Sequence, residues 1–74
     1  MIDFNPIINA RVARRNDVQA HLEELRKGSV REYRWAGGEL PRDVTEEDAR
    51  NFEDDIRELD IEIAQLKKMR KTRR

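Results

Sequence analysis

The stretch that decides the fold is residues 45–69, TEEDARNFEDDIRELDIEIAQLKKM. Its apolar residues recur at alternating intervals of three and four: Ala49, Phe52, Ile56, Leu59, Ile63 and Leu66. This spacing is the heptad seam of a helix that packs lengthwise against another helix. Thr45 precedes three acidic residues, which suit the positive end of a helix dipole. We therefore predict a helix from about Glu46 to Met69 or beyond, with Thr45 as its N-cap.

An earlier stretch predicts a second helix, from about Pro6 to Lys27. Asn5 is a favoured N-cap residue, and Pro6 suits the first helical position. Gly28 suits the residue that follows a helix C-terminus. The apolar stripe of this helix comprises Val18, Leu22 and Leu25. Towards the N-terminus the stripe meets a cluster of basic residues, Arg11, Arg14 and Arg15. A single domain has no obvious use for this basic patch, so we predict that it binds a partner.

The segment between the two helices, residues 29–44, predicts a β-hairpin. Val30, Tyr33 and Trp35 favour strands, and the pair at 37–38, Gly-Gly, is a hairpin turn signal. A two-residue turn pairs Trp35 with Leu40, Tyr33 with Arg42 and Arg31 with Val44. A three-residue turn pairs Glu32 with Arg42 and Arg31 with Asp43 instead. We favour the first register because it places apolar side chains on one face, where burial contributes about 1.5–3 kcal/mol each.

A two-stranded hairpin is marginal alone, so we expect it to lie on the helices. The predicted fold class is α+β and mostly helical: two antiparallel helices with a short β-hairpin between them. Residues 1–66 form this domain, and residues 67–74 form a basic C-terminal tail. The predicted core comprises Val18, Leu22, Leu25, Trp35, Leu40, Phe52, Ile56, Leu59, Ile63 and Leu66.

The composition bears on function mainly by exclusion. The chain of 74 residues contains no Cys, and 43% of its residues are charged, with 16 basic and 16 acidic side chains. Zero net charge disfavours bulk electrostatic binding of nucleic acid or membrane, and no apolar run is long enough to span a bilayer. The lone His21 has no metal-ligand spacing around it, and the acidic run that starts at Glu46 lacks the pattern of a calcium loop. We predict no enzyme, cofactor, metal site or small-molecule ligand.

The order of elements resembles the lambda-type head-to-tail joining protein W family of tailed phages. The resemblance covers residues 18–66 and rests on spaced residues: Leu22, Leu25, Gly28, Val30, Tyr33, Gly37, Gly38, Val44, Thr45, Asp55, Ile56 and Leu59. It differs in a shorter hairpin with Pro41 in the second strand. The resemblance implies a virion protein that forms a ring beneath the portal, completes the head and offers a surface to the next connector or tail protein. It implies a location in the virion, and in the host cytoplasm during assembly.

The predicted partner-binding residues fall into three groups: the basic patch, two projecting residues, and the basic tail. Arg34 projects from the hairpin, and Ile61 lies away from the heptad seam, where an apolar residue indicates a contact. The full set is Arg11, Arg14, Arg15, Arg34, Ile61, Lys67, Lys68, Arg70, Lys71, Arg73 and Arg74. The expected partners are the portal and neighbouring connector proteins, with non-specific DNA contact open for the tail. The alternative function is a small regulatory or inhibitory protein that binds a host enzyme or DNA.

Overall fold

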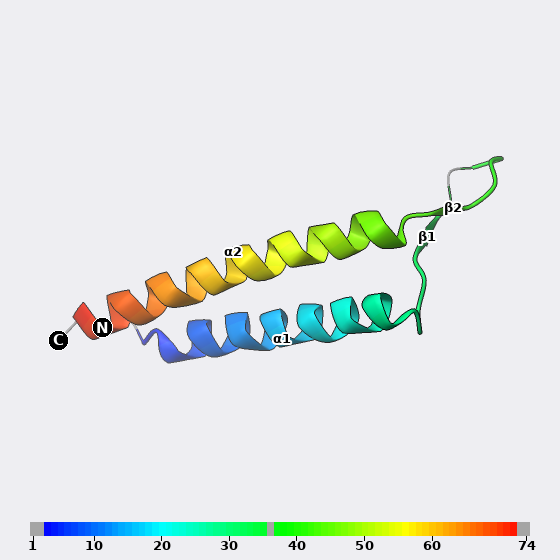
Figure 1. The fold of residues 1–74 in the computed structure, drawn as a ribbon. Helices are drawn as coiled ribbons and strands as arrows, with labels where there is room; N and C mark the ends of the chain where they lie inside the picture. The colour runs from blue at the N-terminus through cyan, green and yellow to red at the C-terminus, as the bar shows by residue number, and fades with distance from the viewer. Residues whose placement is uncertain (1–2, 36, 73–74) are drawn as a thin grey trace.

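The fold is a long helical hairpin whose connecting end carries a small β-hairpin (Figure 1). It is taken from a computed structural model that describes residues 3–35 and 37–72. The elements are α1 (Asn5–Lys27), β1 (Tyr33–Arg34), β2 (Arg42–Asp43) and α2 (Thr45–Thr72). The two strands pair antiparallel. The predicted fold class, mostly helical α+β with a hairpin between two antiparallel helices, is confirmed.

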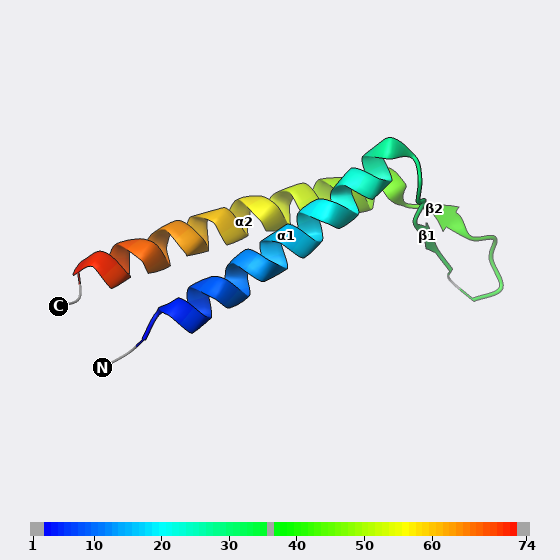
Figure 2. The ribbon, with the colours of Figure 1, turned by 90° about the horizontal axis from the view of Figure 1, so that it is seen from below.

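The molecule is a rod rather than a compact domain. Its extents are 57 × 26 × 16 Å, with both termini at one end and the β-hairpin at the other in two perpendicular views (Figures 1 and 2). The chain exposes 5971 Å², whereas a compact monomer of its mass exposes about 4,800 Å². The difference, about 1,200 Å², exceeds the roughly 800 Å² that one partner buries in a standard interface.

Both helices begin with the same local device, an Asp followed by a buried apolar residue. The Asp3 carboxylate accepts a hydrogen bond from the Asn5 N–H at 3.0 Å, and Asp43 accepts one from the Thr45 N–H at 2.9 Å. Phe4 stands between the first pair and is buried. The predicted N-caps Asn5 and Thr45 are therefore wrong, because an Asp two residues earlier satisfies the free N–H at each helix start.

The end of α1 follows the prediction. Gly28 adopts a left-handed conformation, with φ of 77°, and its N–H donates to the Leu25 carbonyl at 3.2 Å. A residue with a side chain is strained at this φ. Gly28 thus ends the helix and sends the chain towards the β-hairpin.

The core lies between the helices near the β-hairpin end. Val18, Leu22 and Ile56 form a buried cluster, and the partly buried Ala49 and Phe52 pack against it. Of the predicted core residues, those buried within the chain are Val18, Leu22, Leu25, Ile56 and Ile63. Phe52, Leu59 and Leu66 are only partly buried, because a two-helix hairpin covers one side of each helix.

The apolar seam of α1 is longer than predicted. Phe4 and Ile8 are buried, and they extend the stripe to the N-terminal end of the helix. Ile63, near the other end of the α2 seam, is also buried within the chain. This part of the α2 seam therefore needs no second molecule to cover it.

The hairpin register differs from both predicted registers. Tyr33 pairs with Asp43 and Arg34 with Arg42, one residue away from the register that a Gly-Gly turn gives. Beyond the paired residues, the Val44 N–H donates to the Glu32 carbonyl at 2.9 Å. This register brings the buried Val44 and the polar contacts together at the base of the hairpin, and it does not pair apolar residues along one face.

Trp35 and Leu40 are not core residues, contrary to the prediction. Their exposed fractions are 69% and 90%. The hairpin extends away from the end of the helices instead of folding back over them (Figures 1 and 2). No helix therefore faces these side chains, and only Val44, at the base of the hairpin, is buried to 2% exposure.

Candidate functional site

The β-hairpin is held to the helices by a polar network at its base. The Thr45 hydroxyl donates to the Asp43 carboxylate at 2.5 Å and accepts from the Glu32 N–H at 3.0 Å. Arg31 reaches the same carboxylate, with Nε at 3.0 Å. The hydroxyl of Thr45, then its N–H, and then Arg31 donate to the Asp43 carboxylate, and these bonds lower the pKa of Asp43 to about 2. This anchor fixes where the hairpin leaves the helices.

His21 supports the same base from α1. Its Nε2 lies 2.6 Å from the Glu32 carboxylate, and its ring meets the edge of Phe52 with centroids 4.9 Å apart. These contacts give His21 a structural role as a tie between α1, α2 and the chain leading to β1. Among the described residues, no group of His, Asp and Glu side chains converges to hold a metal ion.

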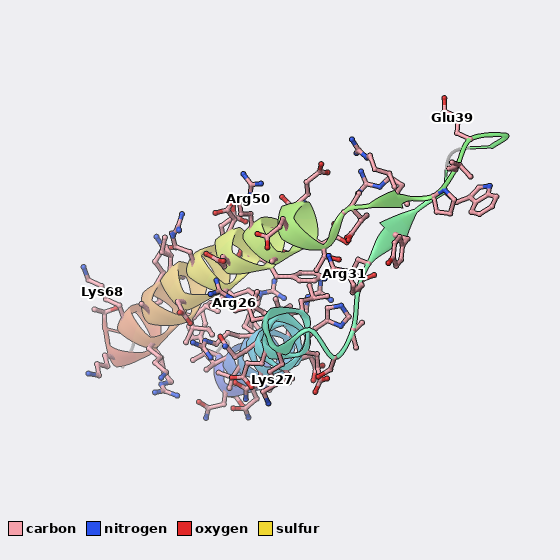
Figure 3. The ribbon with its side chains drawn as sticks, turned by 45° about the vertical axis from the view of Figure 1, so that its right-hand side comes forward. Arg26, Lys27, Arg31, Glu39, Arg50 and Lys68 are labelled. Carbon is pink, nitrogen blue, oxygen red and sulfur yellow. The ribbon has the colours of Figure 1, made fainter. Side chains whose placement is uncertain are left out.

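The β-hairpin carries three large exposed side chains, which we call the hairpin tip: Tyr33 on β1, and Trp35 and Leu40 beyond the paired residues. Tyr33 is 59% exposed, in keeping with the high exposure of the other two. Exposed apolar residues that gather in one place mark interaction sites, whereas scattered ones do not. Figure 3 shows Glu39 at the far end of this loop, well away from the helices.

The arginines of the hairpin lean back towards the start of α2. The Arg34 guanidinium lies 3.7 Å from the Asp48 carboxylate, and Arg42 lies 3.4 Å from Glu47. Both arginines are more than half exposed, so these ion pairs contribute little to stability. Arg34 thus turns back towards α2 instead of projecting freely, although both guanidiniums remain exposed beside the hairpin tip.

A hollow at the junction of hairpin and helices is polar. It is lined mainly by charged side chains, including Glu53, Arg26 and Arg31, and Figure 3 labels the two arginines. Arg26 already pairs with Glu53, and Arg31 pairs with Asp43. The charges of Arg26, Arg31 and Glu53 are thus paired within the chain, and the hollow marks the junction between the hairpin and the helices.

The predicted basic patch on α1 is largely used within the chain. Arg11 pairs with Glu62 at 2.9 Å, and Arg15 pairs with Asp60 at 2.7 Å. Both arginines interrupt the apolar seam of α1 at positions that face α2. Arg14 lines a shallow hollow with the α2 acids Asp55, Glu58 and Glu62 and with Leu59. The patch therefore has a structural use that the sequence did not reveal.

The remaining predicted partner-binding residues lie on α2. Ile61 is 53% exposed, away from the seam as expected. The basic segment continues α2 without a break at residue 66, so residues 67–72 are the last turns of the helix. Arg70 donates to the Asn5 side-chain oxygen at 2.8 Å. Arg73 and Arg74 lie outside the described residues.

The structure thus separates the predicted site residues instead of gathering them. The hairpin tip lies at one end of the rod, and the cations of residues 67–71 lie at the other (Figure 1). Sequence reasoning missed Leu40 as a surface residue and assigned Trp35 to the core. A signal was present, because Arg31, Tyr33, Arg34 and Trp35 together have the composition of an interface hot spot.

Comparisons of the chain with protein-family models, with curated proteins and with solved structures found no match. Within the described residues, neither helix has the length and apolar character that crossing a membrane requires.

Proposed function

We propose that this chain is a docking protein that inserts its hairpin tip into an apolar recess of a protein partner. Its mechanism is adhesion rather than turnover. The particular role we propose is that of a phage head-completion protein, in which copies dock around a portal ring and present a surface to the next connector protein.

The exposed hairpin tip carries this proposal. Aromatic side chains bury about 150–250 Å² each on docking, and Trp, Tyr and Arg dominate the residues that supply binding energy. Tyr33 and Trp35 bring two such side chains to one place, with Arg34 between them in the chain. The base of the hairpin is fixed by Asp43 and Thr45, so part of the ordering cost of docking is already met.

The rod shape supports a docking role as well. The rod is 57 Å long and carries the exposed hairpin tip at one end. A partner bound at the tip is therefore held well away from a second partner bound at the opposite end. The order of helix, hairpin and helix agrees with the joining-protein resemblance, whereas the outward direction of the hairpin was not expected from it. The proposal therefore rests on the tip first and on the resemblance second.

The test is co-sedimentation of the purified chain with a portal ring from the same source. We expect the wild type to sediment with the ring at a stoichiometry matched to its symmetry, and Trp35→Ala to remain in the supernatant. Met69→Ala is the matched control, because Met69 is 49% exposed at the far end of the rod. Equal binding by wild type and Trp35→Ala would contradict the role of the tip.

A second candidate function is a regulatory protein that blocks a host enzyme. The same observation favours it, because a projecting hairpin with an exposed Trp35 can occupy a cleft as inhibitor loops do. It predicts one-to-one binding to a single enzyme rather than ring-matched stoichiometry. If the wild type does not bind the portal ring but binds and inhibits one enzyme, and Trp35→Ala abolishes that inhibition, the regulatory function is supported instead of the connector role.

A further inference from the structure

The end of the rod opposite the hairpin carries cations that the fold does not use. Most of the arginines elsewhere face carboxylates, as in the pairs Arg11–Glu62, Arg15–Asp60 and Arg26–Glu53. The three lysines of the last turns of α2 make no ion pair with any described residue: Lys67, Lys68 and Lys71. Figure 3 shows Lys68 directed away from both helices.

The helix dipole does not account for so many cations. The C-terminus of one helix carries the equivalent of about half a negative charge. The N-terminus of α1 lies beside it and carries about half a positive charge of its own (Figure 1). One acid, Asp3, lies in residues 3–9 and 66–72, against four cations, Lys67, Lys68, Arg70 and Lys71. This end of the rod therefore has surplus positive charge.

The acidic part of the chain is too far away to cancel this charge. Residues 21–54, which form the hairpin end, hold ten acidic and six basic side chains. The rod is 57 Å long, whereas the Debye length at physiological ionic strength is about 8 Å. The two ends thus act independently in solution. The zero net charge of the whole chain suggested from the sequence that it does not bind nucleic acid electrostatically, but this average does not describe the charge at either end.

We propose that the terminal end of the rod, through Lys67, Lys68 and Lys71, binds the phosphate backbone of duplex nucleic acid without sequence preference. Protein interfaces are depleted of Lys, which disfavours a protein partner at this end. Of the described large apolar side chains there, only Ile7 and Met69 are exposed, and this is too little for insertion into a lipid surface. The last turns of α2 contain no aromatic residue, so bases have no stacking surface there.

The experiment measures binding of the full chain to a fluorescent 24-base-pair duplex at several salt concentrations. For contact with three or four phosphates, the logarithm of the binding constant falls with the logarithm of salt concentration at a slope of about −3 to −4. Lys68→Gln/Lys71→Gln should make this slope less negative by about 2. Gln is as good a helix former as Lys, and circular dichroism checks that α2 is intact.

The matched control is Lys27→Gln/Arg50→Gln, which removes the same charge at the hairpin end, where Lys27 and Arg50 are exposed (Figure 3). It should leave the slope unchanged. If both double variants lose the same duplex affinity, the effect comes from net charge alone and the proposal is overturned. Absence of duplex binding by the wild type at 25 mM salt would overturn it as well. Equal affinity for polyglutamate or for anionic lipid vesicles would assign the surface to an acidic protein or a membrane instead. None of these results depends on the hairpin tip, which the Trp35 experiment tests separately.

Discussion

Replacing Arg15 by Leu should stabilise the chain and cause copies of it to associate. Arg15 stands at a seam position of α1, between the buried Ile8 and Val18, and its side chain is 32% exposed. Its ion pair with Asp60 interrupts the apolar contact between the helices at mid-length. The pair is polar at a position where the heptad pattern otherwise places apolar residues.

The size of the effect follows from burial. A fully buried Leu contributes about 1.5–3 kcal/mol, and about two-thirds of that is available at a site as exposed as Arg15. The aliphatic stem of Arg15 already covers part of this surface, and the half-exposed pair with Asp60 contributes only about 0.2–1 kcal/mol. The net gain expected for Arg15→Leu is therefore about 1 kcal/mol.

Urea unfolding followed by circular dichroism measures this gain. With a slope of about 1 kcal/mol per molar urea for so small a protein, a gain of about 1 kcal/mol should raise the midpoint by about 1 M with the slope unchanged. Arg14→Leu is the control, because Arg14 is exposed beside the seam, and its midpoint should stay within the error. A midpoint that falls by more than 0.5 M would refute the reasoning and show that the ion pair outweighs packing.

The same variant tests specificity by sedimentation velocity. A continuous apolar seam can pair with a second chain, and single polar seam residues are known to fix the number and register of helices. We therefore expect Arg15→Leu to form dimers or larger species at concentrations where the wild type does not. A variant that is more stable and sediments as the wild type does would show that Arg15 has no such role.

Three further outcomes follow from the structure. Leu22→Ala should lower the free energy of unfolding by about 2–5 kcal/mol, measured by urea unfolding, because Leu22 is in the buried cluster. As the contrast, Trp35→Ala should change the free energy of unfolding by less than about 0.5 kcal/mol. Gly28→Ala should cost about 1–2 kcal/mol, measured in the same way, because φ is 77° there; an unchanged midpoint would contradict the left-handed cap. Asp43 has a pKa lowered from 3.8 to about 2, so its contribution is present above about pH 4 and lost as pH falls towards 2; the stability difference between wild type and Asp43→Asn should shrink across this window and stay constant above it.

The helical part of the fold was predictable because its signals are local and repeat along the chain. The heptad spacing of α2 and the C-terminal Gly28 each determine structure within a few residues. Phe4 was missed because Arg11 and Arg15 interrupt the α1 seam, which hid that the same spacing continues back through Ile8 to the N-terminus. The hydrogen bonds that begin the helices were also missed. Asp3 and Asp43 lie two residues before the first helical residue, whereas the N-cap rule considers only the residue directly before it.

The candidate site was harder to predict because exposure is decided by tertiary structure. A strand-forming Trp35 has the same local preference whether it is buried or free. The prediction assumed that a marginal hairpin must lie on the helices. The structure shows another solution, in which the base of the hairpin is held by Asp43, Thr45 and Arg31 and the outer part stands free.

The free hairpin has an energetic consequence that connects the fold to the proposed docking. Burying Trp35 and Leu40 in this chain would contribute about 1.5–3 kcal/mol each, and a domain this small has little stability to spare. The fold instead uses Val44 and the polar anchor at the base, and it leaves that apolar surface in water. A partner that covers the hairpin tip recovers the same free energy on binding. The stability that the isolated chain forgoes by leaving Trp35 and Leu40 exposed thus becomes available as affinity for the partner. For this reason Trp35→Ala should leave the fold intact and weaken docking.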